Sequence, residues 1–235
     1  MKVMIFGLGS IGKRHAKLLL KHFNFELFAF RTTKGKGIEG VKNIRAWKDV
    51  NKIKPDVAMI CNPTDKHIAT ALKCVEKGMH LFIEKPIGVG TRDLNVLIKK
   101  VREAKLKSYI AYPFRFNSDI NSWVGKMTGL NRDATIVHET DITKWGGTYS
   151  KKAITGGGAI LELSHEIDIA EFLFGPIVKI DAECEGYGHK FTDAETKARL
   201  VTTHQDGMMC SIYLSLVKKG KPRRFICFDS SAKNM

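Results

Sequence analysis

A glycine-rich turn near the first residue constrains the fold more than any other feature of the sequence. Residues 2–12 have the sequence KVMIFGLGSIG, and apolar residues at helical spacing follow over positions 13–21. A strand, a G-x-G-x-x-G turn and a helix in this order are the context in which the motif binds a dinucleotide. Gly7 permits the tight turn, Gly9 lets a pyrophosphate approach the backbone, and Gly12 lets helix and strand pack closely. The segment therefore predicts a nicotinamide dinucleotide site; the alternative is an α/β turn that binds nothing.

The remaining pattern divides the protein in two. Before residue 117, expected strands alternate with expected helices, which is typical of βαβ units and a parallel sheet. After residue 118, one expected helix at 159–174 is accompanied by strands near 133–142, 178–186, 196–204, 208–217 and 223–229. We therefore expect an α/β protein. It has a Rossmann dinucleotide-binding domain at 1–117 and an α+β domain with an open, mostly antiparallel sheet at 118–235.

The net charge of +15 lies entirely in the first half. Residues 1–117 contain 24 Lys and Arg against 9 Asp and Glu, whereas residues 118–235 contain 15 of each. A positive field on the expected cofactor domain attracts polyanionic ligands such as a phosphorylated dinucleotide or a nucleotide sugar. The lysines are scattered and lack aromatic interleaving, so a nucleic-acid partner is disfavoured. A solvated basic surface with no specific ligand is the other interpretation.

Hydropathy and cysteine content indicate the compartment. No apolar run approaches 18 residues, so we expect no membrane span. The first strand begins within two residues of Met1, which leaves no room for a signal peptide. The five cysteines are widely spaced without a C-x-x-C pair, so neither a metal site nor a disulfide framework is expected. These features predict a cytoplasmic protein.

The end of the second expected strand bears on cofactor choice. In an NAD site, an acidic residue about 20 positions beyond the glycines binds the ribose 2′-hydroxyl. This protein has Arg31 there, followed by Thr32 and Thr33. A guanidinium binds a 2′-phosphate, and no carboxylate is present to repel it. The sequence predicts NADP in preference to NAD; the alternative is a solvent-exposed arginine.

Two further segments carry candidate catalytic groups. Glu84-Lys85-Pro86 follows an expected parallel strand, at the sheet edge where α/β folds bind ligands, and Lys85 can stabilise a substrate oxygen as hydride leaves. The alternative for Lys85 is a surface ion pair with Glu84.

The second segment follows the triple glycine at 156–158. On the helix expected there, His165 has Glu162 and Asp168 as neighbours at i, i±3. A carboxylate orients an imidazole and tunes it for proton transfer, so His165 is a candidate acid–base group. A purely structural histidine is the alternative.

Together these pieces resemble the Gfo/Idh/MocA oxidoreductases. The matching segments are GLGSIG with Arg14-His15, CNPTDKH at 61–67, GMHLFIEKPIG at 78–88, YPFRFN at 112–117 and GGGAILELSHEID at 156–168. They extend over about 170 residues in the family's order. The segment LSHEID and the residues at 149–152 resemble those of a subgroup that acts on sugars or nucleotide sugars.

The resemblance implies specific roles. Lys85 would be the catalytic lysine and His165 the acid–base group with Glu162 beside it. The residues expected to hold the cofactor are Gly7, Gly9, Ser10, Ile11, Gly12, Arg31, Thr32, Cys61, Asn62, Pro63, His67, Glu84 and Lys85. The residues expected to border the substrate are Arg115, Asn117, Tyr149 and His165. The resemblance also implies a homo-oligomer formed through the C-terminal sheet.

Two departures from the family pattern accompany these expectations. Glu162 stands where the family has Asp, so its carboxylate reaches further. Relatives have about 330 residues or more, which makes this protein short at its C-terminus and places its activity in question. The favoured function is hydride transfer between a nicotinamide and a carbon of a sugar or nucleotide sugar. The alternatives are a non-catalytic, dinucleotide-sensing regulatory protein of the same fold and an inactive fragment.

Overall fold

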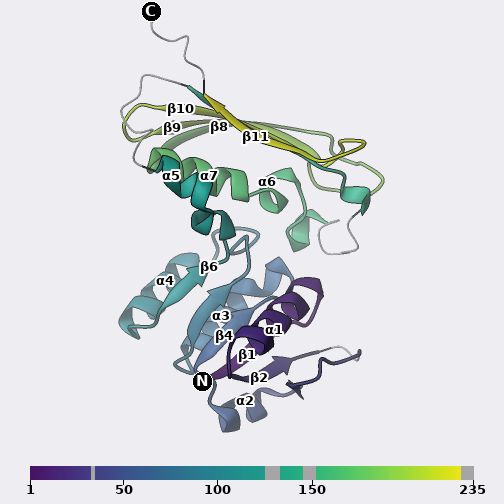
Figure 1. Cartoon of the computed structure of the whole chain (residues 1–235), viewed down its shortest axis with the longest axis vertical. Coiled ribbons are helices and arrows are strands. Elements are labelled where there is room, and N and C mark those ends of the chain that lie inside the picture. Colours follow the sequence, from purple (N-terminus) through teal and green to yellow (C-terminus); the bar gives the residue numbers. More distant parts are fainter. Residues whose placement is uncertain (33–34, 125–132, 145–151, 229–235) are drawn as a thin grey trace, which may run out of the picture. The chain divides into compact units, whose positions relative to one another are not determined.

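The computed structural model describes residues 1–32, 35–124, 133–144 and 152–228 of the protein. Two compact units comprise Met1–Ala111 and Tyr112–Met235. The division lies before the expected boundary at Asn117. Each unit is described separately below, with its elements labelled as in Figure 1.

The N-terminal unit is built on a parallel six-stranded sheet with the order β3-β2-β1-β4-β5-β6 (Figure 1). Its strands are β1 Lys2–Phe6, β2 Glu26–Phe30, β3 Val41–Ile44, β4 Val57–Ile60, β5 His80–Ile83 and β6 Ser108–Ile110. Its α-helices are α1 Ser10–His22, α2 Trp47–Ile53, α3 His67–Val75 and α4 Leu94–Glu103. The strand order reverses between β1 and β4, and ligands of such sheets bind at this switch point, beyond the carboxyl ends of the strands.

Both faces of this sheet are covered, which explains the continuous apolar runs of its strands. Alternate residues of β1 enter different cores. Met4 and Phe6 pack with residues of α2, α3 and α4, whereas Val3 and Ile5 pack with Ala16 of α1. The sheet is therefore doubly wound, as expected from the alternation of strands and helices.

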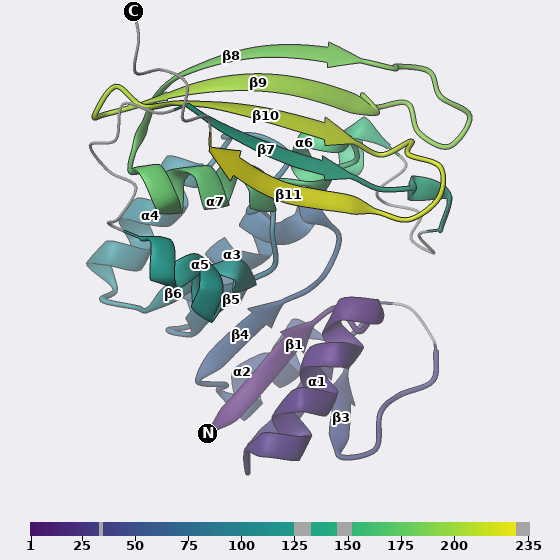
Figure 2. The same cartoon turned by 45° about the horizontal axis from the view of Figure 1, so that its top comes forward.

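The C-terminal unit contains a five-stranded sheet with the order β11-β7-β10-β9-β8 (Figure 2). Its strands are β7 Ala134–Glu139, β8 Ile177–Glu185, β9 Lys197–His204, β10 Met209–Ser215 and β11 Arg223–Phe228. Of these described strands, β7 and β10 pair in parallel and the other neighbours are antiparallel. A hairpin turn after His204 joins β9 to β10, with the Gly207 N–H donating to the His204 carbonyl.

Helices cover one face of this second sheet. They are α5 Ser118–Trp123, α6 Ala159–Glu162 and α7 His165–Phe174, with 3-10 turns at Pro113–Phe116 (η2), Ile142–Lys144 and Ala153–Thr155. Alternate strand residues such as Ile136, Leu200 and Ile212 are buried against α6 and α7. The opposite face carries the remaining side chains of the strands, including Arg199 and Tyr213.

The helix expected at 159–174 is wrong in one respect, because two helices occupy this range. The first helix, α6, ends at Glu162 and is followed by its C-cap residue Leu163, with φ −104° and ψ 26°; α7 begins at His165. A contact from outside the segment holds the start of α6, because the Ala159 N–H donates to the backbone carbonyl of Glu195. Glu162 and His165 therefore lie on different helices, and not on one continuous face.

Candidate active site

The three glycines of the first turn play different structural parts. Gly7 has φ +95°, and a Cβ there would lie 2.8 Å from backbone atoms of Asn62. A Cβ at Gly12 would lie 2.1 Å from the Gly7 carbonyl oxygen. A Cβ at Gly9 would meet no described heavy atom within 4 Å. The fold requires glycine at positions 7 and 12, whereas Gly9 leaves open space at the N-terminus of α1.

This open space fits a dinucleotide pyrophosphate. Gly9 is the N-cap residue of α1 and has no side chain to satisfy the first N–H groups of the helix, which include those of Ser10 and Ile11. Such N–H groups and the positive end of the helix dipole bind phosphates. The cofactor-binding assignments of Gly7, Gly9, Ser10, Ile11 and Gly12 therefore agree in geometry with a phosphate site.

Arg31 lies directly after β2, at the expected ribose end of the site. Its Nη1 donates a hydrogen bond to Oδ1 of Asn43, at 3.1 Å. Thr32 follows and is exposed. Thr33 and Lys34 lie outside the described residues. The arrangement orients a guanidinium at this end of the sheet, where the sequence predicts recognition of a 2′-phosphate.

The loops after β4 and β5 are tied together by His67. Its side chain is almost fully buried, with Nδ1 2.9 Å from the Pro86 carbonyl oxygen and Nε2 2.8 Å from the Asn62 carbonyl oxygen. A neutral imidazole donates from only one of these nitrogens. Burial lowers the pKa of His67, and the two carbonyl groups oppose that shift. Through these contacts, His67 holds the segment of Asn62 against the cis Lys85–Pro86 peptide.

The carboxylate of Glu84 connects the loop after β5 with α1. Its Oε1 lies 2.6 Å from Nε2 of His15, and its Oε2 accepts a hydrogen bond from the Lys85 N–H at 3.3 Å. The side chains of Glu84 and His15 are mostly buried. The ring of His15 also packs edge-on against Phe82 of β5. His15 thus fastens the helix that follows the glycine turn to the strand end that carries Lys85.

The other expected residues of this edge are placed with them. Cys61 is buried directly after β4, and burial, with a smaller contribution from Glu84, raises the pKa of its thiol. The thiol therefore stays protonated near neutral pH. Pro63 precedes the short 3-10 turn Thr64–Lys66, which leads into α3. The N-terminal unit thus gathers its expected cofactor residues at the carboxyl edge of one sheet.

In the C-terminal unit, His165 begins α7 and lies between two aromatic rings. Tyr112 packs edge-on at 5.7 Å between ring centroids, and Phe114 at 5.2 Å. Burial raises the pKa of Tyr112. Glu162 ends the preceding helix, α6. Flanking rings limit the rotation of an imidazole, which suits an acid–base group that must hold one orientation.

The expected substrate residues Arg115 and Asn117 make defined contacts. The Arg115 guanidinium donates from Nε and Nη2 to the buried Asp168 carboxylate, the shortest bond being 2.7 Å. The side-chain oxygen of Asn117 caps α5 by accepting from the Ile120 N–H. Asp168 therefore binds Arg115, whereas the i, i+3 pattern paired it with His165. Tyr149 lies outside the described residues.

The triple glycine before α6 makes room for a capping carboxylate. Gly158 has φ +113°, and a Cβ there would lie 2.4 Å from Oε1 of Glu195. That oxygen accepts a hydrogen bond from the Ile160 N–H. No sequence pattern indicates this contact, because Glu195 is 35 residues away from Ile160.

Sequence reasoning also missed partners whose signal is weak. In the sequence, His15 is marked only by its place in the Arg14-His15 pair. Its hydrogen bond to Glu84 joins residues 69 positions apart, which only the folding of the parallel sheet brings together. Asp168 stands out as a neighbour of His165, but its partner Arg115 lies 53 positions earlier. Among the described residues, no group of three or more His, Cys, Asp or Glu side chains is arranged to hold a metal ion. None of the described helices is long and apolar enough to cross a membrane.

A Rossmann unit with an open phosphate site, followed by a mixed-sheet unit with a candidate acid–base histidine, defines a class of two-unit dinucleotide-binding proteins. Matches to family models identify this class more closely. Residues 1–112 match the Gfo/Idh/MocA oxidoreductase family with its NAD-binding Rossmann fold, and residues 125–229 match the GFO/IDH/MocA C-terminal domain. The protein belongs to the Gfo/Idh/MocA family.

Curated relatives match this protein at about a quarter of the aligned positions. D-glucoside 3-dehydrogenase of Escherichia coli is 27% identical over 197 residues, covering 76% of this protein and 56% of the relative. Myo-inositol 2-dehydrogenase of Thermotoga maritima is 22% identical over 196 residues, with the same coverage. The protein thus spans little more than half the length of these relatives.

Solved structures show the same fold at lower identity. GenD2 from gentamicin A biosynthesis, in complex with NAD, has a TM-score of 0.85 at 15% identity, and the match covers 99% of this protein and 70% of GenD2. The WlbA dehydrogenase of Bordetella pertussis, in complex with NADH and UDP-GlcNAcA, has a TM-score of 0.84 at 17% identity, covering 97% and 76%.

Proposed function

We propose that this protein is an oxidoreductase that transfers a hydride between a nicotinamide dinucleotide and a CH–OH carbon of a sugar or nucleotide sugar. The observation that carries the proposal is the space at Gly9, which lies in the turn between β1 and α1 and fits a pyrophosphate. Family membership supports the reaction class. The names of relatives support the substrate class, because they include sugar, inositol and nucleotide-sugar dehydrogenases.

The residues would divide the work between the two units. The glycine turn and the N-terminus of α1 bind the pyrophosphate, and the loops held by His67 and Glu84 orient the rest of the cofactor. The bound nicotinamide supplies the group that accepts or donates hydride. Lys85 stabilises the substrate oxygen, and His165 takes the hydroxyl proton when the carbon is oxidised. Arg115, Asn117 and Tyr149 border the substrate, and Glu162 supports His165.

We also propose that NADP is preferred to NAD. Arg31 follows β2 where an NAD site has a carboxylate, and its hydrogen bond to Asn43 orients its guanidinium. The structures of related dehydrogenases named above contain NAD or NADH. Dissociation constants of NADPH and NADH for the wild-type protein and an Arg31→Ala variant decide the point. Tighter NADPH binding that is lost in the variant supports the preference, and tighter NADH binding contradicts it.

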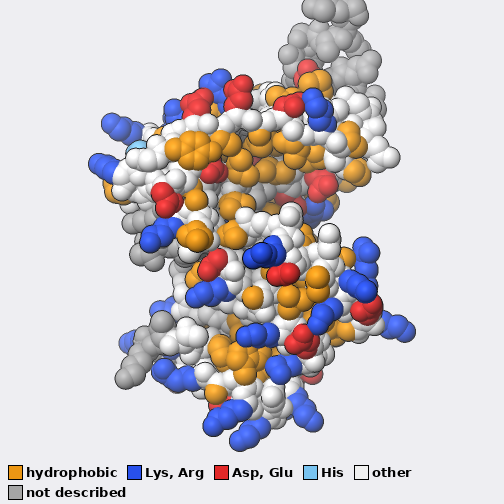
Figure 3. Space-filling model, turned by 180° about the vertical axis from the view of Figure 1, so that it is seen from behind, with side chains coloured by type: hydrophobic (Ala, Val, Ile, Leu, Met, Phe, Trp, Pro, Cys, Tyr) orange, Lys and Arg blue, Asp and Glu red, His pale blue; other side chains and the backbone are white. Residues whose placement is uncertain are grey.

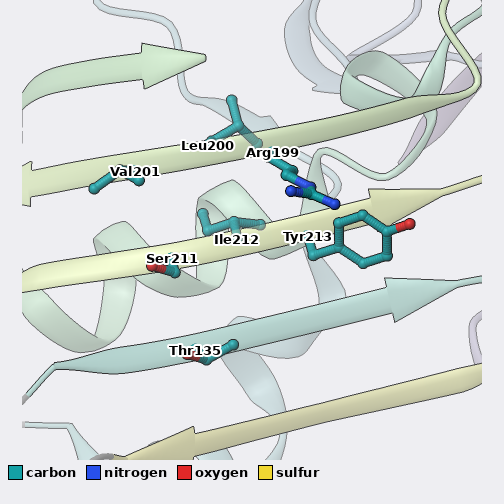
Figure 4. Close-up of a pocket in the computed structure, with 7 residues that line it drawn as sticks. All are labelled: Thr135, Arg199, Leu200, Val201, Ser211, Ile212 and Tyr213. Carbon is teal, nitrogen blue, oxygen red and sulfur yellow. The ribbon is translucent and has the colours of Figure 1, made fainter. Parts of the chain in front are cut away.

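The exposed face of the C-terminal sheet is our proposed contact between copies of the protein. A hollow of about 430 Å³ on this sheet includes Thr135, Arg199, Val201, Ser211 and Tyr213 among its lining residues (Figure 4). Nearby Met209 and Phe225 are 44% and 38% exposed. On the side of the N-terminal unit that Figure 3 shows, Lys and Arg side chains are more prominent than Asp and Glu. Sedimentation of wild type and of Val201→Glu tests this, since a charge in the hollow should dissociate an oligomer; an unaltered oligomer would reject the face.

We keep a cytoplasmic location as a proposal. It rests on the five cysteines, all of which are free thiols in the structure. Free thiols are typical of proteins in a reducing compartment.

Turnover tests the central proposal. The protein would be mixed with NAD⁺ or NADP⁺ and with free hexoses, inositols and UDP-sugars, and the reduction of the nicotinamide would be followed by absorbance. Lys85→Met and His165→Asn should each lower kcat by about 10²-fold or more, because each removes a group that acts on the reacting oxygen. Cofactor binding should persist in both variants. Unchanged turnover in Lys85→Met contradicts its role, and binding without turnover in wild type favours the dinucleotide-sensing alternative.

A further inference from the structure

A buried charge cluster lies on the helix-covered face of the C-terminal sheet. Glu166 of α7 is fully buried. Its Oε1 lies 3.1 Å from Nδ1 of His138 and pairs with Nη2 of Arg224. His138 of β7 and Arg224 of β11 are direct cross-strand partners, so both side chains face α7. A buried carboxylate requires such partners, because the desolvation of its charge is otherwise uncompensated.

Arg224 makes a second contact that leads toward His165. Its guanidinium carbon lies 3.9 Å from the ring centroid of Phe114, which belongs to η2. The Phe114 ring in turn packs edge-on against the imidazole of His165, with an interplanar angle of 90°. Arg224 therefore contacts both the residue that follows His165 in the sequence and the ring that flanks its imidazole.

We propose that Arg224 is a positioning residue for His165. One end of its guanidinium fixes Glu166 and hence the first turn of α7, while its planar face presses Phe114 against the imidazole. A planar guanidinium that stacks on an aromatic ring and pairs with a carboxylate does both at once; a lysine ammonium lacks the planar face. The inference rests on the proposed function in one respect, namely that His165 is the acid–base group.

Arg224→Lys is the informative variant, because it keeps the charge beside Glu166 and removes the planar face. The ring of Phe114 shifts the NMR resonances of the His165 imidazole, so these resonances report the ring contact without any turnover. We expect the His165 signals of the full-length protein to move in Arg224→Lys. Turnover, where measured, should fall about tenfold in kcat with KM within about twofold, as expected when a reacting group is slightly misplaced.

Arg223→Lys is the matched control. Arg223 adjoins Arg224 on β11 but points to the opposite face, where its Nε lies 2.7 Å from Oε2 of Glu139, and its side chain is 55% exposed. Neither the His165 resonances nor kcat should change in this variant. Equal changes in the two variants would show a general effect of altering β11 and would overturn the proposal.

A double mutant tests the path through Phe114. In a Phe114→Leu background, adding Arg224→Lys should have no further effect on the His165 resonances, because the ring that transmits the contact is absent. Fully additive effects would overturn the proposal. Should Arg224→Lys lose its cooperative melt, Glu166→Gln replaces it: this variant releases the guanidinium while keeping the side-chain shape. It should move the same resonances, and unmoved resonances would overturn the proposal.

The proposed function fails separately. If His165→Asn retains full turnover, His165 is not the acid–base group, whatever the resonances show. If His165→Asn is inactive and the resonances stay unmoved in Arg224→Lys, the function stands and the positioning role is rejected.

Discussion

The two units hold their candidate residues in different ways. In the N-terminal unit, the candidate phosphate site is a contiguous turn, from Gly7 to Gly12, whose shape follows from the residues themselves. In the C-terminal unit, His165 contacts the rings of Tyr112 and Phe114, and Phe114 in turn contacts Arg224 of β11, so its surroundings come from segments far from it in the sequence. The first site is encoded locally, and the second depends on the completed fold.

This difference sets what a substitution does in each unit. In the glycine turn, each position has its own steric requirement, so a change acts locally and can separate folding from binding. Around α7, side chains that stabilise the fold also surround His165, because buried charges such as Glu166 and Asp168 need partners from other elements. The comparison therefore predicts that substitutions can separate stability from binding in the glycine turn, but not around α7.

The largest expected effect is that of Gly12→Ala. A Cβ there would lie 2.1 Å from the Gly7 carbonyl oxygen, which is backbone and cannot move aside cheaply. We expect a loss of about 3 kcal/mol in the free energy of unfolding, at the upper end of typical overpacking costs. Gly9→Ala is its control, because a Cβ at this position would meet no described heavy atom within 4 Å and the residue has φ −71°.

Urea unfolding of both variants, together with NADH titration, checks this pair. Gly9→Ala should unfold within about 0.5 kcal/mol of wild type and yet bind NADH at least about tenfold more weakly. A large loss of stability in Gly9→Ala, or none in Gly12→Ala, would contradict the separate roles of the two glycines.

Asp168→Ala should have the next largest effect. It leaves the Arg115 guanidinium without the carboxylate that accepts three hydrogen bonds from it. Breaking a buried ion pair costs about 3–5 kcal/mol, but the Arg115 side chain is 34% exposed and regains some hydration. We therefore expect a loss of about 2–3 kcal/mol.

The exposed pair of Lys179 and Asp181 supplies the control for Asp168. Its nitrogen and oxygen also lie 2.7 Å apart, but both side chains are more than 60% exposed. Asp181→Ala should therefore change the free energy of unfolding by less than about 0.5 kcal/mol. Thermal melts of the two variants decide the matter, and similar losses would mean that burial does not govern these pairs.

The smallest expected effect is the pH dependence contributed by His67. Burial lowers its pKa in the folded protein below the ordinary value of 6.5. The unfolded protein therefore binds a proton first, so this contribution to stability is complete above pH 6.5 and is lost as the pH falls through the folded pKa. His67→Asn should flatten the stability profile below pH 6.5. A steeper loss of stability on acidification in the variant would contradict the sign.

Much of the N-terminal unit was predictable from sequence because its signals are local. The alternation of strands and helices expected before residue 117 is confirmed by elements such as β2 (Glu26–Phe30), β3 (Val41–Ile44), α2 (Trp47–Ile53) and β4 (Val57–Ile60). Each is short and bounded by glycine, proline or a polar cluster, and the parallel sheet follows from their alternation with helices. The cofactor turn was visible for the same reason.

The C-terminal unit was predictable as a sheet, but its contacts were not. The register that places Arg224 opposite His138, above Glu166, depends on which strands pair, and short-range periodicity carries no such information. The break between α6 and α7 escapes prediction for a similar reason: the start of α6 is held by Glu195, which lies outside the helical segment. Helical spacing alone therefore places Glu162 and His165 on one helix.

The most direct test of the central claim is a fluorescence titration of the protein with NADH and with NADPH, performed in parallel on Gly9→Ala. The claim is that the glycine turn of the N-terminal unit binds a nicotinamide dinucleotide. It predicts saturable binding by wild type and at least about tenfold weaker binding by Gly9→Ala, with both proteins folded. Binding of neither nucleotide by the folded wild-type protein, or equal binding by both proteins, would contradict it.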